Sequence, residues 1–213
     1  MQKSEVLSDD NQIVIINNME PPSQKEDELR TISIYGDIEE TKCSEVVSVL
    51  MYLRDTALVP KLTDPENLES EIVFDSKPIK MIVSTYGGSS AEMFSVYDTM
   101  RSVKETCDVE TIGLGKVMSA GVLLLAGGTK GKRKIGANCR VMIHNVMGGS
   151  HGMLSNLEND IEEIKWSQAN YIKCLAAETK LTQTRLKKML KRNMDVYLSA
   201  EQAVEFGIAD EII

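Results

Sequence analysis

A serine and a histidine stand out in this sequence because of where they fall. Ser119 lies where the strand-like segment VETIG passes through the turn GLGKVM into an apolar run of small residues. His144, one of two histidines in the chain, ends the apolar stretch RVMIH 25 residues later. An imidazole that accepts the proton of a serine hydroxyl turns that hydroxyl into a nucleophile for acyl transfer. Taken alone, a helix cap at Ser119 and an inert core-edge histidine at His144 are the alternatives.

A carboxylate is the third group that this chemistry needs, because it fixes the tautomer of the imidazole. Asp195, in RNMDVYLSA, is the candidate, and it gives the chain order Ser, His, Asp. By itself Asp195 is one of 32 acidic residues and carries little signal. Composition does not show whether the three side chains meet in space.

Two strand-to-helix turns are candidate sites for stabilising an oxyanion. A helix that starts directly after Ser119 places free N–H groups and the positive end of its dipole beside the hydroxyl. The turn TYGGSS, residues 85–90, has paired glycines, which let a backbone N–H approach a ligand closely. A turn without any catalytic role explains TYGGSS equally well. Neither turn is a phosphate loop or a dinucleotide fingerprint, because the glycines these motifs require are missing.

The composition excludes several classes of protein. A net charge of −8 and an isoelectric point near 5.0 argue against binding nucleic acid or an anionic membrane through bulk charge. The four cysteines form no C-x-x-C pair, so we expect free thiols in a reducing compartment, with no metal site and no disulfide framework. Neither a secretory signal nor a membrane-spanning stretch is evident, which predicts a cytoplasmic protein.

The order of strand-like and helix-like segments predicts an α/β domain of βα repeats. We expect a flexible N-terminal segment over residues 1–29 and one domain over residues 30–213. Residues 56–77 interrupt the pattern and are interpreted as a surface insertion, in which Asp64-Pro65 opens a short helix. A long helix from Ser155 to about residue 179 carries an apolar stripe, so one of its faces is expected to be buried.

Three longer stretches resemble the ClpP family of ATP-dependent serine peptidases: GLGKVMSAGVLLLAGGTKGKR, NCRVMIHNVMGG and DVYLSAEQAVEFGIAD. The resemblance implies that Ser119 is the nucleophile, that His144 is the general base and that Asp195 orients His144. It also implies that the oxyanion is held by two backbone N–H groups. One belongs to Gly88, from the turn that reads S-P-G-G in the family, and the other to Ala120.

The resemblance runs from about Arg30 to the C-terminus and implies the fold and partners of the family, with no cofactor. The family has a crotonase-like α/β fold and forms two stacked seven-membered rings around a sealed chamber. An AAA+ unfoldase supplies this chamber with unfolded polypeptide. The long helix resembles the handle that joins the rings, and the N-terminal segment would line the axial pore. This sequence departs from the family at Tyr86, where S-P-G-G has its proline, and at Asn145-Val146, where the family has Gln-Pro.

The leading hypothesis is therefore a serine-type endopeptidase that cuts unfolded polypeptide through an acyl-enzyme on Ser119. The first alternative is a catalytically weak or inactive ring subunit with a role in assembly or regulation. An acyl-CoA hydratase or isomerase on the crotonase scaffold would rely on glutamates instead of a Ser–His pair. A Ser–Lys dyad would use Lys116 in place of His144.

Overall fold

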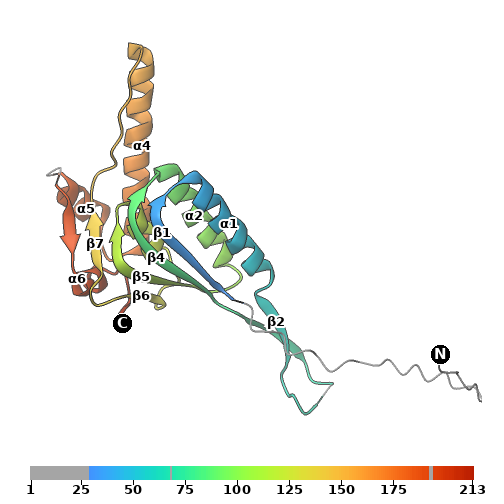
Figure 1. Ribbon diagram of the computed structural model, residues 1–213. Coiled ribbons are helices and arrows are strands. Elements are labelled where there is room, and N and C mark those ends of the chain that lie inside the picture. Colours follow the sequence, from blue (N-terminus) through green and yellow to red (C-terminus); the bar gives the residue numbers. More distant parts are fainter. Residues whose placement is uncertain (1–28, 68, 192–193) are drawn as a thin grey trace, which may run out of the picture.

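The computed structural model describes residues 29–67, 69–191 and 194–213 (Figure 1). In chain order the elements are β1 (Thr31–Ile38), α1 (Glu40–Asp55), β2 (Leu58–Leu62), β3 (Ile72–Ser76), β4 (Ile79–Gly88), α2 (Ser90–Val103), β5 (Val109–Met118), α3 (Ala120–Ala126), β6 (Arg133–Ile135), β7 (Arg140–Ile143), α4 (Leu154–Glu178), α5 (Gln183–Leu190), β8 (Val196–Leu198), α6 (Ala200–Glu205) and β9 (Glu211–Ile212).

A mainly parallel sheet forms the body of the molecule. Its strands follow the order β1-β4-β5-β6-β9, and all of these neighbours are parallel. The short strand β7 pairs in parallel with the last residues of β5, and β8 pairs antiparallel with β7. Parallel neighbours need crossover connections, which the intervening helices provide. The predicted α/β class is therefore confirmed.

Helices cover one face of this sheet and leave the other face more open. Figure 1 shows α1 and α2 lying side by side along the sheet. In the first half of β5, Val109, Thr111 and Gly113 are buried, while the alternating residues Glu110, Ile112 and Leu114 are partly exposed. Such alternation is typical of a strand with one packed face.

The helix that follows Ser119 is part of the core. All seven residues of α3 are buried, and the helix lies against β4 and β5 and also contacts α2 and α4. A helix that is apolar on every side is stable only when it is enclosed. Because α3 is held on all sides, the position of the residue at its N-terminus is held as well.

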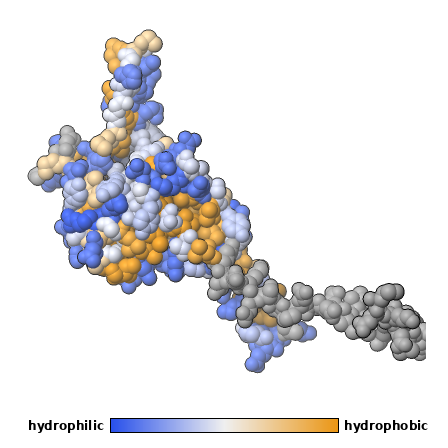
Figure 2. All heavy atoms as spheres, viewed as in Figure 1, coloured by the Kyte–Doolittle hydropathy of each residue, from blue (hydrophilic) through white to orange (hydrophobic). Residues whose placement is uncertain are grey.

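The longest helix, α4, projects away from the body (Figure 1). It begins at Leu154, one residue earlier than predicted, with Met153 at the cap position and no capping side chain. Its buried residues all lie in its C-terminal half: Tyr171, Ile172 and Leu175. Apolar side chains remain exposed along the rest of the stripe and at the free end of α4 (Figure 2). No helix in the described ranges has the length and apolar character needed to cross a membrane.

The segment interpreted as an insertion forms the antiparallel hairpin β2–β3, which extends from the body away from α4 (Figure 1). The prediction of a short helix after Asp64 is wrong. The Asp64 carboxylate accepts a hydrogen bond from the N–H of Glu66 at 3.0 Å and closes a turn between the two strands. Aspartate favours turns of this kind because its short side chain bonds to backbone two residues later.

Candidate active site

A cleft of about 670 Å³ opens where the C-terminal ends of β4 and β5 meet the start of α3 and the end of β7. Four of the five predicted site residues line it: Gly88, Ser119, Ala120 and His144. Asp195 instead borders a neighbouring hollow beside α5. Among the described residues, no group of three or more His, Cys, Asp or Glu side chains could hold a metal ion.

The structure brings Ser119 and His144 into direct contact. Ser119 Oγ lies 2.7 Å from His144 Nε2, a normal length for a hydrogen bond that involves a hydroxyl. Ser119 leads into α3 from the end of β5, and His144 follows the end of β7, which pairs with the same part of β5. Two segments distant in sequence thus meet because their strands are neighbours. In this arrangement the imidazole can take the proton of the hydroxyl.

The backbone of Ser119 adopts a conformation that is unusual for a residue with a side chain. Its φ is 53° and its ψ is −123°, and it is the one non-glycine residue with positive φ in the described ranges. Such a conformation costs about 1–3 kcal/mol and persists only where the surroundings enforce it. Here the N–H of Ser119 donates to the carbonyl oxygen of Met142 at 2.8 Å, and the N–H of Val122 donates to the Ser119 carbonyl at 3.0 Å. Strained serines at strand-to-helix turns are typical of nucleophiles.

Tyr171 is a site residue that the sequence did not reveal. It belongs to the buried half of α4, lines the cleft, and donates its hydroxyl hydrogen to the carbonyl oxygen of Ser119 at 3.2 Å. Burial raises the pKa of this phenol, so the group remains a donor. In the sequence Tyr171 belongs to an apolar helical stripe, where an aromatic residue looks like ordinary core.

Asp195 lies opposite His144 at the end of the β7–β8 strand pair, but it forms no hydrogen bond or ion pair with His144 in the described ranges. The antiparallel pairing of β7 with β8 ends at Ile143 and Val196, which makes His144 and Asp195 the next opposing positions. Opposing residues of such a pair have Cα atoms about 5 Å apart. However, Asp195 is exposed, and it forms no hydrogen bond or ion pair with His144 within the described part of the chain. The structure thus contains a Ser–His pair with a carboxylate beside it.

The residues after His144 show what replaces the Gln-Pro of the family. The side chain of Asn145 donates to the carbonyl oxygen of Leu190 at 2.9 Å. The N–H of Val146 donates to Oε1 of Gln168 at 2.5 Å. A proline has no N–H and could not form the second bond. Hydrogen bonds to α4 and α5 therefore position the segment that carries the histidine.

The two glycines at the end of β4 are closely packed, Gly87 against Ser119 and Gly88 against the backbone of Ile38. A Cβ added to Gly87 would lie 2.5 Å from Ser119 Cβ, and a Cβ added to Gly88 would lie 2.2 Å from the carbonyl oxygen of Ile38. Both glycines have positive φ, at 111° and 152°. The N–H of Gly87 is engaged by Thr85 Oγ1 at 2.9 Å. Space and backbone conformation therefore require glycine at both positions.

Tyr86 stands exposed at the edge of the cleft and is contacted by a lysine from the next strand. The ammonium of Lys116 lies 4.6 Å from the centroid of the Tyr86 ring, within the range of a cation–π contact. No hydrogen bond joins Lys116 to Ser119 within the described ranges. His144, and not Lys116, is therefore the basic side chain that contacts the serine hydroxyl.

A buried arginine holds the far end of α3. Arg133, which is 4% exposed, donates to the carbonyl oxygens of Ala126 at 3.1 Å and of Glu178 at 2.7 Å. It also binds the Asp210 carboxylate through two nitrogens, at 2.6 and 2.8 Å. Burial acts to raise the pKa of Asp210, but the hydrogen bonds and charge of Arg133 outweigh it, so the pKa lies below its ordinary value. This arrangement ties α3 to α4 and to the C-terminal segment.

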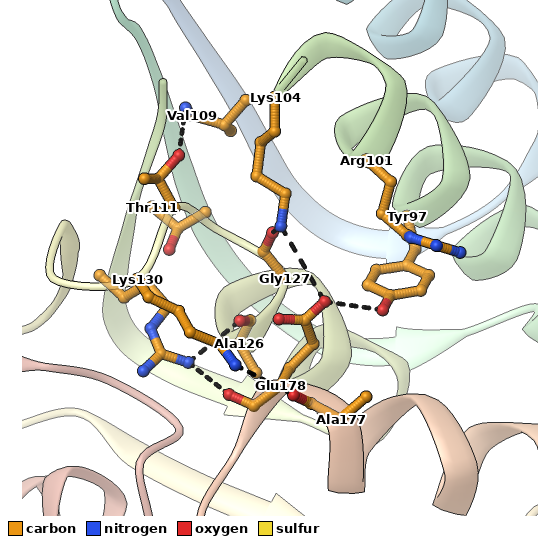
Figure 3. A network of polar contacts seen from close by, with 12 residues as sticks. Tyr97, Arg101, Lys104, Val109, Thr111, Ala126, Gly127, Lys130, Ala177 and Glu178 are labelled. Carbon is orange, nitrogen blue, oxygen red and sulfur yellow. Dashed lines mark hydrogen bonds and ion pairs between the residues drawn. The ribbon is translucent and has the colours of Figure 1, made fainter. Parts of the chain in front are cut away.

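A second set of polar contacts surrounds Glu178, as Figure 3 shows. The Glu178 carboxylate accepts a hydrogen bond from the Tyr97 hydroxyl at 2.8 Å and lies 3.9 Å from the ammonium of Lys104. Lys104 also donates to the carbonyl oxygen of Gly127 at 2.7 Å. Lys104 at Gly127 and Arg133 at Ala126 therefore satisfy carbonyl oxygens at the C-terminal end of α3, where a helix leaves its last carbonyls without partners.

The fold and site together define a class: an α/β protein with a strained serine, hydrogen-bonded to a histidine, at the C-terminal ends of parallel strands. Comparison with known families narrows this class. The Clp protease family matches residues 67–213, which is 147 of the 213 residues, and the chain belongs to this family. Members of this family are generally serine peptidases, and the mixed α/β architecture is consistent with their ClpP/crotonase fold.

Proposed function

We propose that this chain is the proteolytic subunit of a self-compartmentalised, ATP-dependent serine protease that hydrolyses peptide bonds of unfolded polypeptides. The observation that carries the proposal is the 2.7 Å contact between Ser119 Oγ and His144 Nε2, with Ser119 held at a φ of 53°. Local strain of this kind in a cleft is a reason to infer function, because packing alone does not require it. Membership of the Clp protease family supports the same reaction.

The reaction is acyl transfer in two halves. Ser119 Oγ attacks the carbonyl carbon of a peptide bond while His144 Nε2 takes the hydroxyl proton. The resulting oxyanion accepts hydrogen bonds from the N–H groups of Gly88 and Ala120, which both line the cleft. When the C–N bond breaks, His144 returns the proton to the leaving amine. Water, with His144 again as the base, then hydrolyses the ester and restores Ser119.

Asp195 is the residue that we propose to orient the imidazole. In the catalytic state its carboxylate accepts the hydrogen of His144 Nδ1, which leaves Nε2 free to act as the base. The support for this role is its position opposite His144 at the end of the β7–β8 pair. The carboxylate must turn from the hollow beside α5 to make this contact.

Assembly is the second part of the proposal. Leu154 at the free end of α4 and Trp166 along it are 72% and 58% exposed. Contiguous exposed apolar side chains mark interaction surfaces. We propose that α4 joins copies of this chain into two stacked seven-membered rings in the cytoplasm. An AAA+ unfoldase would then feed polypeptide into the chamber that the rings enclose.

A catalytically weak or inactive ring subunit is the second candidate. The observation that favours it is the absence of a hydrogen bond between Asp195 and His144 in the described part of the chain. Without a carboxylate partner, an imidazole is a poorly oriented base, and the rate drops by about 10⁴ in the best-studied example.

One experiment separates the two candidates. The purified protein is treated with a fluorophosphonate, the modified residue is located by mass spectrometry, and peptidase activity and particle size are measured in parallel. The protease predicts modification at Ser119, cleavage of unfolded polypeptide, and a large ring particle. Ser119→Ala should abolish labelling and cleavage and leave the particle intact, whereas Ser102→Ala, at an exposed position near the C-terminal end of α2, should change neither activity nor labelling.

The contrary results are equally distinct. A well-assembled particle that is neither labelled nor active would favour the regulatory ring subunit. Cleavage that persists in Ser119→Ala would overturn the assignment of the nucleophile. Full activity in His144→Ala would overturn the assignment of the base and bring back the dyad with Lys116.

A further inference from the structure

Two cations lie side by side next to the catalytic cleft. Lys116 of β5 pairs with Arg140 of β7 in the parallel register, and two positions further along Met118 pairs with Met142. Both methionines line the cleft. Side chains two residues apart on a strand project from the same face, about 7 Å from one another. Lys116 and Arg140 therefore lie on the cleft side of the sheet, one row from the methionines.

The burial pattern supports this placement. Val117 and Val141, which separate the two rows, are fully buried on the opposite face of the sheet. Arg140 is exposed and Lys116 is partly exposed. Both cations are thus on the open face of the sheet, one row beyond the methionines that line the cleft.

An aromatic side chain fixes the direction of one of the cations. The Lys116 ammonium rests over the ring of Tyr86, which is 64% exposed and lines the cleft. A cation–π contact of this kind stabilises the position of the ammonium group without neutralising its charge. The edge of the cleft therefore carries a positive charge held against an aromatic surface.

Neither cation has an acidic partner in the described part of the chain, although carboxylates are abundant. The sequence has 32 acidic residues against 24 lysines and arginines. On the neighbouring strand β6, Lys134 pairs with Glu211, and just before it Lys132 pairs with Asp108. Lys116 and Arg140 have no such ion pair among the described residues. Two adjacent unpaired cations beside a binding cleft can accept a carboxylate from a ligand.

We propose that Lys116 and Arg140 form a subsite for an acidic side chain of the polypeptide substrate. The apolar part of the cleft, formed by Met118, Met142 and Tyr197, would take an apolar side chain close to the bond that is cut. An extended substrate advances about 3.3 Å per residue, so the acidic residue would lie about two positions from the apolar one. This inference rests on the proposed peptidase activity and adds the substrate class.

The first measurement is a comparison of matched fluorogenic peptides. Each peptide keeps a leucine at the cleavage site and carries either glutamate or glutamine at one of the flanking positions. The wild-type protein should cleave the glutamate peptide about two- to fivefold more efficiently at one position, the effect of a partly exposed ion pair. Raising the salt concentration should reduce that preference, because exposed charges are screened.

The second measurement assigns the preference to the two cations. Lys116→Gln and Arg140→Gln should each reduce the glutamate preference, and the double variant should remove it. In Lys116→Glu combined with Arg140→Glu, the preference should invert toward peptides that carry lysine. Lys80→Gln is the matched control, because Lys80 is an exposed lysine at the start of β4 and should leave the preference unchanged.

Binding to Ser119→Ala provides a readout that does not depend on turnover. Labelled glutamate peptides should bind this variant more tightly than glutamine peptides by the same factor. If peptides are cleaved at Ser119 with no glutamate preference at any position, the subsite is wrong and the proposed function stands. If no peptide is cleaved and Ser119 is not labelled, the proposed function fails and the subsite fails with it.

Discussion

The two ends of the proposed catalytic group are held very differently. Ser119 is held by main-chain hydrogen bonds from both directions and by the buried hydroxyl of Tyr171, on a helix enclosed by the core. Asp195 is exposed and directly precedes the three-residue strand β8. It has no hydrogen bond to His144 in the described ranges. A strained nucleophile needs enforcement from its surroundings, while a group that only orients its neighbour does not. If Ser119 is the nucleophile, as proposed, the contrast indicates that its position is fixed by the fold and that the Asp195 carboxylate is the adjustable part of the site.

The strongest test of this contrast is Asp195→Asn. If the carboxylate turns toward His144 during catalysis, kcat for a peptide substrate should drop by about 10²–10⁴, because the amide favours the wrong imidazole tautomer. Labelling of Ser119 should slow as well, while particle size stays the same. Glu205→Gln, an exposed acidic residue on α6, serves as the control. An unchanged kcat would mean that Ser119 and His144 work as a pair without Asp195.

Arg133→Met tests whether Arg133 anchors the C-terminal end of α3, the helix that begins directly after Ser119. Removing the guanidinium leaves the Asp210 carboxylate and two carbonyls without their partner, so the free energy of unfolding should decrease by about 3 kcal/mol. Denaturant titration of the assembled protein measures this loss. Lys165→Met, which breaks an exposed pair with Glu162, should change stability by less than about 0.5 kcal/mol. Equal effects of the two variants would contradict the anchoring role.

The same ion pair predicts a pH dependence of stability. The pKa of Asp210 is held below its ordinary value of 3.8, because the bonds and charge of Arg133 outweigh burial. Its stabilising contribution is therefore complete above that ordinary value and is lost as the pH falls through the lower pKa of the folded state. Thermal melting from pH 5 downward should show a steeper decrease for the wild type than for Arg133→Met. Parallel curves would show that Asp210 does not contribute.

Gly87→Ala tests the contact between the glycine turn and the nucleophile. The added methyl group would lie 2.5 Å from Ser119 Cβ and 3.0 Å from Oγ, at a φ of 111°. Displacement of the hydroxyl by a fraction of an ångström should lower kcat by about 10². Gly131→Ala is matched for backbone strain, since φ is 84° there and no atom lies within 4 Å of the new methyl group. It should lose stability and retain kcat.

Tyr171→Phe should have the smallest effect. It removes one hydrogen bond to the Ser119 carbonyl and nothing else, so kcat should decrease about fivefold with KM unchanged. Tyr97→Phe removes a similar hydrogen bond, to Glu178, at a distance from the cleft. Tyr97→Phe should lower the melting temperature about as much as Tyr171→Phe does, but it should leave kcat unchanged. If both variants change kcat equally, Tyr171 has no special role at the site.

Much of this architecture was predictable from local patterns. The capping box at Ser199 and Gln202, which opens α6, is such a local pattern, because its two hydrogen bonds join residues only three positions apart. The strand over Arg140–Ile143 follows from its run of apolar residues. The expected helix after Asp64 was wrong, because pairing between β2 and β3 makes that segment a hairpin loop. Local propensity did not contain this long-range pairing.

The sequence by itself determined the chemistry that is available: a serine at a strand-to-helix turn, a histidine at a strand end, and a pair of glycines at a second strand-to-helix turn. These depend on residue type and on contacts over short stretches of chain. The tertiary structure decided which groups meet. Pairing of β5 with β7 places Ser119 Oγ 2.7 Å from His144 Nε2. The same pairing sets Lys116 beside Arg140. The packing of α4 against α3 brings Tyr171 to Ser119, and Asp195 lies in a separate hollow beside α5. Such contacts join residues far apart in the chain, and only the packing of whole strands and helices fixes them.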